Sequence, residues 1–158
     1  MKQIGIYFIC AIIILNLSGC CTTTKTPNIK SVNKLYAEYK EEIDSVVNFL
    51  AITEYDVIII SDSSGTMIAD LQTIEIPDLN IRETINHLIG TEIVKRFYKD
   101  NRNIEINIWN HKETRYWMAC TIDNTIPSVQ YATEVIPMDE TGWYFVIASY
   151  SKWRIRNK

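Results

Sequence analysis

Residues 104–109 repeat with a period of two: isoleucine stands at every even position, and the odd positions hold Glu105, Asn107 and Trp109. Successive side chains of a β-strand point to opposite faces of a sheet, so the pattern predicts a strand whose isoleucines share one buried face. Such a segment needs neighbouring strands and a second layer that covers its apolar face.

The residues that follow predict a hairpin. The turn sequence NHKET (110–114) leads into a second alternation, in which Tyr116, Met118, Cys120 and Ile122 form the inward face. Pairing of residue 108 with 116, and of 106 with 118, keeps both apolar sets on one side of the sheet. Two further strands, at about 128–136 and 143–150, are bounded by Pro127, Pro137 and a turn around Gly142.

Two other segments show a helical period. Residues 31–50 carry apolar side chains at every third or fourth position, and so does the segment from Ile81 to about Tyr98. Asn80 is a suitable cap for the second helix, with Glu83 as its capping-box partner. Gly90 lies inside this helix and weakens it by about 1 kcal/mol, which indicates a close approach to a neighbouring element or a break.

Between these helices, the β-branched run at 56–60 predicts a buried strand, and residues 66–76 continue with strand-like composition after a turn. The order of helix, hairpin, helix and four strands predicts an α+β fold. We expect a mainly antiparallel sheet of about five or six strands with two helices packed on one face. Residues 31–158 are enough for a single domain with its own core.

The N-terminus has the pattern of an export signal. Lys2 precedes an apolar run from Ile4 to Leu17, and small residues follow. A helix of this length spans roughly 21 Å, which is short of the roughly 30 Å hydrocarbon core of a bilayer. We therefore interpret residues 1–19 as a signal peptide that is removed. The polar, threonine-rich residues 20–30 are then a flexible tether.

Leu17, Ser18, Gly19 and Cys20 resemble the lipobox of bacterial lipoproteins. The resemblance implies cleavage between Gly19 and Cys20, and acylation of the Cys20 thiol. Acyl chains on Cys20 would hold the domain outside the cytoplasm, at the cell membrane or the outer membrane. In a cell with two membranes, Cys21 at the second mature position favours the outer membrane, because it is not the aspartate that retains such proteins at the inner one.

Charge and cysteine content exclude several function classes. The formal net charge of −3 gives no basic footprint for nucleic acid. Two histidines, His87 and His111, and the absence of a CxxC or HExxH motif give no zinc site. A Cys21–Cys120 disulfide is open to an exported protein, although an inward Cys120 also packs well as a free thiol. We expect no cofactor.

The loop after the first predicted strand offers a weak metal site. Asp62, Ser64 and Thr66 resemble the metal-site loop of von Willebrand A domains, in which an aspartate and two hydroxyls meet Mg²⁺. The same letters faintly resemble an aspartate-based phosphatase loop. A plain hairpin turn is the alternative, because aspartate and serine bond their own backbone and Gly65 supplies a positive φ. The strand-like residues that follow favour the turn.

The tryptophans all lie after residue 108. On the predicted hairpin, Trp109 and Trp117 fall on the face opposite the isoleucines, beside Arg115. An exposed face of this kind would be a platform for a glycan or a protein partner, whereas a helix or the C-terminal segment that covered it would make it core. The basic side chains near the C-terminus suit either solvent or lipid headgroups.

The segment from about residue 100 to 154 resembles a family of small bacterial proteins, mostly from Firmicutes. The shared features are the strand with Trp109, the return strand ending near Ile122, the Gly142-Trp143-Tyr144 start of the last strand, and a terminal Trp153-Arg154. The resemblance implies a shared domain and brings no activity with it.

Together these observations predict a lipid-anchored binding domain rather than an enzyme. Its partner would be the membrane, through acyl chains on Cys20, and an envelope protein or glycan. An immunity-type or inhibitor protein is the alternative. A metal-binding domain or a hydrolase that uses the Asp62 loop is a weaker one.

Overall fold

The computed structural model describes residues 26–123 and 125–156. The helices are α2 (Ile29–Glu38), α3 (Lys40–Ile52), α4 (Leu79–Gly90) and α5 (Tyr150–Arg156). The strands are β1 (Ile58–Ile60), β2 (Thr66–Ala69), β3 (Gln72–Glu75), β4 (Arg96–Lys99), β5 (Asn103–His111), β6 (Thr114–Thr121), β7 (Ala132–Pro137) and β8 (Trp143–Ser149). Within these residues the fold is α+β, as the sequence predicts.

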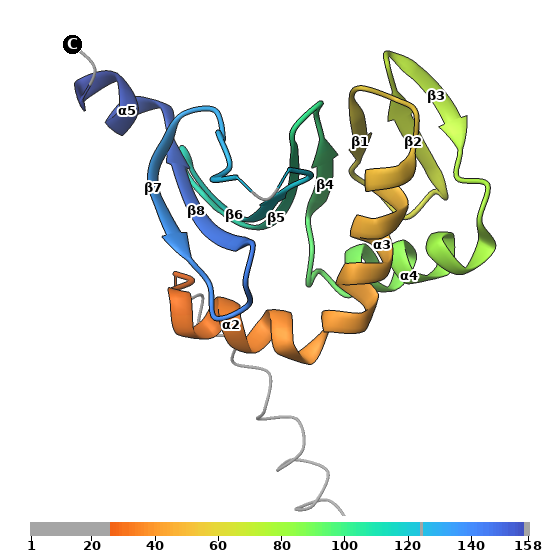
Figure 1. The fold of residues 1–158 in the computed structure, drawn as a ribbon, viewed down its shortest axis with the longest axis horizontal. Coiled ribbons are helices and arrows are strands. Elements are labelled where there is room, and N and C mark those ends of the chain that lie inside the picture. Colours follow the sequence, from red (N-terminus) through yellow and green to blue (C-terminus); the bar gives the residue numbers. More distant parts are fainter. Residues whose placement is uncertain (1–25, 124, 157–158) are drawn as a thin grey trace, which may run out of the picture.

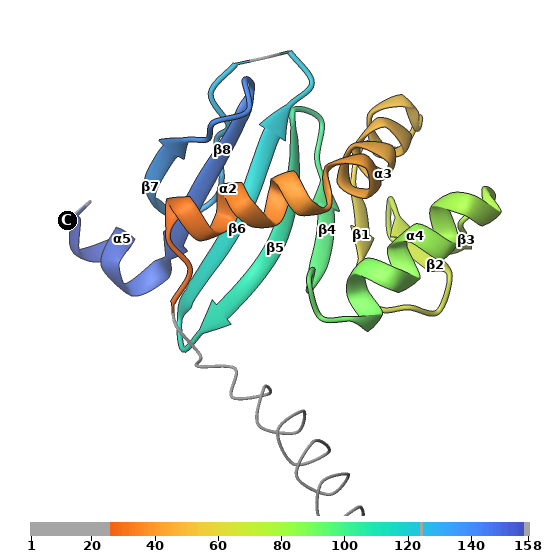
Figure 2. The same ribbon diagram turned by 90° about the horizontal axis from the view of Figure 1, so that it is seen from below.

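The described strands form one eight-stranded antiparallel sheet in the order β3-β2-β1-β4-β5-β6-β8-β7. The predicted count of five or six strands was too low, because β3 and β4 were read as parts of neighbouring elements. Figures 1 and 2 show α2, α3 and α4 on one face of the sheet, where two helices were expected. The part formed by β4 to β8 curves like a trough, and α2 lies beneath its convex side (Figure 1).

The main core lies between the three helices and the convex face. Each helix contributes fully buried side chains at helical spacing, among them Ile43, Val46 and Leu50 of α3. The isoleucines of β5 lie on this face, as predicted, and Phe97 and Phe145 pack there from β4 and β8. Burial of such side chains contributes about 1.5–3 kcal/mol each.

The single helix predicted for residues 31–50 is two helices. Tyr39 leaves the helical region (φ −115°, ψ 22°) and ends α2, and α3 starts at Lys40. The break lets Tyr36 reach Trp143 of β8, at 4.8 Å between ring centroids, while α3 packs on α4 and β5. Asn28 and Ser31 form a capping box, so α2 begins at Ile29, inside the predicted tether of residues 20–30.

The second helix is shorter than predicted and has another cap. Asp78, not Asn80, caps α4 by accepting hydrogen bonds from the backbone of Asn80 and Ile81. The helix ends at Gly90, and residues 96–99 form β4 between β1 and β5. Phe97 fits an apolar position of either period, so pairing with two strands decided the conformation of this segment.

The segment 66–76 is a hairpin rather than one strand. Asp70 and Leu71 both have positive φ (45° and 71°) in the two-residue turn that joins β2 and β3. A two-residue turn of this kind favours asparagine and glycine. Because Asp70 and Leu71 are neither, the sequence gives little indication of the turn.

The predicted register of the long hairpin is correct in part. Ile106 pairs with Met118 as predicted, but Tyr116 pairs with Trp109 instead of Ile108, because an irregularity lies between Asn107 and Trp109. An extra residue in one strand reverses the faces of the residues beyond it.

Candidate functional site

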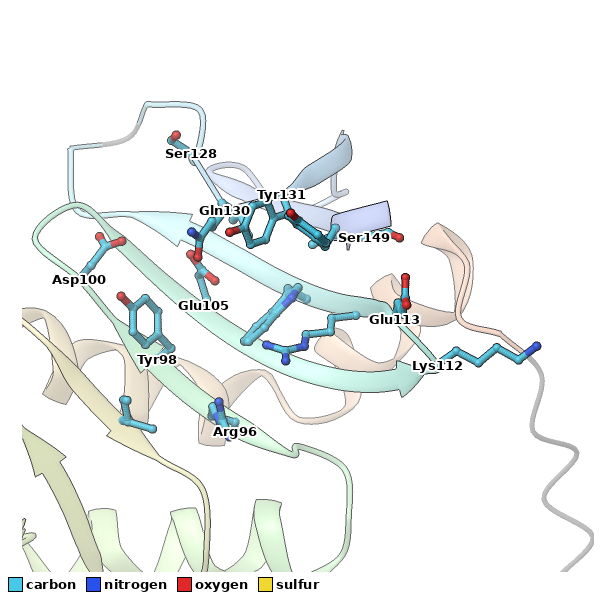
Figure 3. A pocket seen from close by; sticks show the side chains of 16 residues that line it. Arg96, Tyr98, Asp100, Glu105, Lys112, Glu113, Ser128, Gln130, Tyr131 and Ser149 are labelled. Carbon is cyan, nitrogen blue, oxygen red and sulfur yellow. The ribbon is translucent and has the colours of Figure 1, made fainter. Parts of the chain in front are cut away.

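The concave face of the sheet, opposite the three helices, holds a pocket of about 700 Å³ (Figure 3). This volume is within the range of small-molecule sites, about 300–1,000 Å³. The lining comes from β1, β4, β5, β6 and β8, the turn after β5, the segment 128–131 and the start of α5.

Small side chains make room for the pocket. Ala148 lines it, and Ala119 lies on the same face of the next strand. Both belong to a second core cluster, together with Trp117, Val129 and Val146. Val129 closes over the sheet from the segment before β7, so Trp117 is only 7% exposed. The concave face is therefore apolar near its centre and polar toward its edges.

Glu105 is the buried carboxylate of this site. It is 6% exposed, and Figure 3 shows it pointing into the pocket. Among the described residues no side chain or backbone N–H donates to its carboxylate, and no cation pairs with it. Burial, and then the nearby Asp100, raise the pKa of Glu105 from its usual 4.5 to about 7.

Asp100 is already engaged by its own turn. Its Oδ1 accepts hydrogen bonds from the backbone N–H groups of Arg102 (2.8 Å) and Asn103 (2.7 Å). The amide of Asn103 donates to both carboxylate oxygens. Tyr98, opposite Glu105 on β4, is half-buried, and burial raises the pKa of its hydroxyl. At this end of the pocket, Glu105 is thus the acceptor that has no donor within the described chain.

The other end is basic. Arg96 and Arg115 line the pocket, and among the described residues neither guanidinium group has an ion-pair or hydrogen-bond partner. With Lys95, Asn107, Asn110 and Trp117 they also line an adjoining hollow of about 120 Å³ that has no acidic side chain. Lys95 pairs with Glu92 at 2.9 Å. Arg96 and Arg115 are both exposed, so their guanidinium groups are accessible to an anion. Lys112 and Glu113 also line the main pocket.

Aromatic rings form one rim. Tyr131, at positive φ (60°), meets Tyr150 and Trp153 edge to face, with centroids 5.0 and 5.3 Å apart. Arg156 donates to the carbonyl of Thr133 at 2.6 Å and ties α5 to β7. The C-terminal segment is thus a helix against β7, and its first residue, Tyr150, lines the pocket. The alternative that the tryptophans are core is correct, although Val129 rather than this helix packs over Trp117.

The aromatic face predicted from the sequence is divided between the two sides of the sheet. Arg115 and Trp117 lie in the pocket lining. Trp109 packs against the convex core, because the irregularity after Asn107 turns it to that side. The prediction that Trp109 and Trp117 share a face was wrong. Glu105 was not singled out as a site residue, although a carboxylate within an apolar strand is a visible sign.

The loop with Asp62, Ser64 and Thr66 forms a hairpin turn between β1 and β2. Asp62 accepts a hydrogen bond from the Ser64 backbone (2.9 Å), and the Ser64 and Thr66 hydroxyls bond each other (2.7 Å). None of the three lines the pocket, and the described residues contain no group of three potential His, Cys, Asp or Glu ligands. The side-chain oxygens of this loop form hydrogen bonds within the turn.

The remaining predicted residues lie elsewhere. His87 meets Glu42 of α3 at 2.7 Å, so it joins two helices instead of facing only solvent. Cys120 packs partly buried against the convex core as a free thiol, as its inward position predicts, and burial raises its pKa to about 12. Gly19, Cys20 and Cys21 lie outside the described residues. Among the described helices, none has the length and apolarity to cross a membrane.

Comparisons with protein-family models, curated proteins and solved structures give no match to this chain. The pocket therefore has to be interpreted from its own chemistry.

Proposed function

We propose that this protein is a lipid-anchored binding protein whose ligand site is the concave pocket. The observation that carries the proposal is the carboxylate of Glu105, a largely buried side chain that opens into a pocket of about 700 Å³ and accepts no hydrogen bond from the described residues. A carboxylate in a cleft whose pKa is raised by burial is a candidate for ligand binding, because a ligand can supply the donor that the described chain does not.

The anchor part of the proposal rests on residues 17–20. Acyl chains on Cys20 would place the domain at an extracytoplasmic membrane surface, where it meets a glycan, a peptide or a protein of the envelope. Asn28 and α2 follow the tether, and α2 lies on the convex side. A tether that joins the domain there leaves the concave pocket open to a ligand.

A compound screen tests the binding function. Thermal melts of the full-length chain in detergent would be recorded with four classes: amino acids and short peptides, saccharides, nucleotides, and fatty acids. We expect at least one class to raise the melting temperature, because a ligand that binds only the folded state stabilises it. If no class does so, the concave pocket is not a small-ligand site.

Two variants locate the site. Ala148→Leu fills the pocket and should remove the shift, while Arg154→Gln, an exposed change on α5 outside the lining, should keep it. The ligand-free melt of each variant reports whether it folds. Crosslinking and pull-down of the tethered protein from its own cells tests the alternative: one stoichiometric protein partner, with no small-ligand shift, would favour an immunity-type inhibitor.

A further inference from the structure

The charges of the pocket are arranged in rows across the sheet. Tyr98, Glu105 and Ala119 are paired across β4, β5 and β6, and Arg96, Asn107 and Trp117 form the next row along the same strands. Paired residues of an antiparallel sheet share a face, and rows on that face are about 7 Å apart. The carboxylate row and the first arginine row are therefore neighbours.

The two rows differ in what they lack. Within the described residues, Glu105 offers an acceptor that no donor reaches, and Arg96 offers an exposed cation that pairs with no carboxylate. Arg115, paired with Ala148 one row further along β6, adds a second unpaired guanidinium to the same end. Glu105 forms no ion pair with either arginine, so the opposite charges of the pocket do not neutralise each other directly.

Trp117 lies between the two ends. It lines both the main pocket and the basic hollow beside it. Trp117 is only 7% exposed, so it contributes an apolar wall that suits the middle of an elongated ligand charged at both ends. Tyr98 supplies a second aromatic surface, next to Glu105.

We propose that the pocket takes a zwitterion with a primary ammonium and a carboxylate group, namely an amino acid or a short peptide. The ammonium pairs with Glu105, and the carboxylate meets Arg96 and Arg115. A guanidinium matches a carboxylate in a bidentate geometry, and an ammonium supplies the donors that Glu105 lacks. The inference rests on the proposed binding function and names its ligand class.

Modified ligands test each charge separately. Calorimetry of the full-length chain in detergent would compare phenylalanine and the dipeptide Ala-Phe with N-acetyl-Ala-Phe and with Ala-Phe amide. We expect the free dipeptide to bind, and each blocked derivative to bind about tenfold more weakly or worse, because each loses one charged hydrogen-bond pair.

Variants connect each ligand end to its residue. Glu105→Gln should bind Ala-Phe and its N-acetyl derivative equally, while it still discriminates against the amide. The double variant Arg96→Gln/Arg115→Gln should show the reverse. Glu134→Gln on β7 and Arg154→Gln on α5 are exposed changes outside the lining and should keep both preferences. A thermal melt of each variant confirms that it is folded.

The results separate the inference from the function on which it rests. If the free and blocked dipeptides bind equally, or if only saccharides, nucleotides or fatty acids bind, the zwitterion inference is wrong and the binding function stands. If no compound of any class binds, both are wrong.

Discussion

Glu105 lies on a central strand of the sheet, and no donor of the described residues reaches its carboxylate. Nearby, Asp100 has three donors and lies in a turn. The two carboxylates differ because Asp100 is engaged by its own loop, whereas Glu105 projects from a strand whose backbone groups are used in the ladder. This difference is what gives the pocket its chemistry.

The raised pKa of Glu105 predicts a pH dependence of stability. Between pH 4.5 and about pH 7 the folded protein binds more protons at this residue than the unfolded chain does. The stabilisation is complete below pH 4.5 and is lost as the pH rises through 7, up to about 3 kcal/mol in the free energy of unfolding.

Glu105→Gln should therefore unfold at a higher temperature than the natural protein at pH 8 and at the same temperature at pH 4. Thermal melts across this range measure the difference, with Glu134→Gln as the exposed control. Parallel melting curves for Glu105→Gln and the natural protein at every pH would contradict the assignment. Asp100 and Tyr98 interact electrostatically with the Glu105 carboxylate, so the measured difference includes the loss of those interactions.

Two glycines predict effects of opposite sign. Gly65 has φ +79°, and a Cβ there would lie 2.7 Å from Cδ of Arg82, whose guanidinium binds Glu75 and the carbonyl of Ile76. Gly65→Ala should lower the free energy of unfolding by about 1–2 kcal/mol. Gly90→Ala meets nothing within 4 Å at the end of α4 and should raise it, by up to about 1 kcal/mol. Urea titrations measure both changes in the free energy of unfolding. If the two variants change it in the same direction, the prediction is wrong.

At the scale of elements, the irregularity in β5 decides which aromatic side chain reaches the pocket. Asn107 still pairs with Trp117, but Trp109 pairs with Tyr116, which faces the convex core. Of the two tryptophans of this hairpin, Trp117 therefore lies on the pocket side of the sheet and Trp109 on the side of the main core. Breaking the strict alternation also places the Nε1 of Trp109 in the core without a hydrogen-bond acceptor.

The cap of α4 gives a test of the element boundaries. Asp78 accepts hydrogen bonds from the backbone N–H groups of Asn80 (2.8 Å) and Ile81 (3.2 Å). Asp78→Ala should lower the free energy of unfolding by about 1 kcal/mol, because two N–H groups lose their acceptor. Asn80→Ala, at the position that the sequence pattern favoured, should leave it unchanged or slightly higher. Urea titration measures the free energy of unfolding of both variants. A larger decrease for Asn80→Ala than for Asp78→Ala would indicate that Asn80 is the cap.

At the scale of the whole molecule, α2, α3 and α4 cover one face of the sheet, and the pocket lies on the other face. The first described helix, α2, lies on the convex side of the sheet, and the pocket lies on the concave side. This division is compatible with simultaneous membrane attachment and ligand binding.

The anchor itself is testable without the domain's ligand. Cys20→Ala should abolish fatty-acid labelling in cells and leave the precursor uncleaved, because the thiol is the acceptor that the lipobox resemblance implies. Cys21→Ala should do neither. Metabolic labelling with a palmitate analogue and the apparent mass on a gel measure the two outcomes, and an exchange of phenotypes would move the first mature residue to Cys21.

Local pattern was sufficient for much of the fold. The period of two in β5 and β6 and the buried run in β1 predicted strands correctly, because alternation and β-branching act over a few residues. The apolar stripes of α3 and α4 were also correct in kind. The predicted element boundaries were wrong where the local pattern is compatible with two structures. Phe97 fits a helix or a strand, and Tyr39 fits a continuous or a broken helix.

The site depended on contacts between residues far apart in sequence. Arg115 and Trp117 were visible as polar-face residues of the hairpin, but the tertiary structure alone brought Tyr98 and Arg96 of β4 beside them and closed Val129 over the sheet. It also buried Glu105 and turned Trp109 away. Sequence period determines which residues alternate, whereas strand order, register shift and curvature determine which of them face a common cavity, because these depend on pairing and packing across the whole sheet.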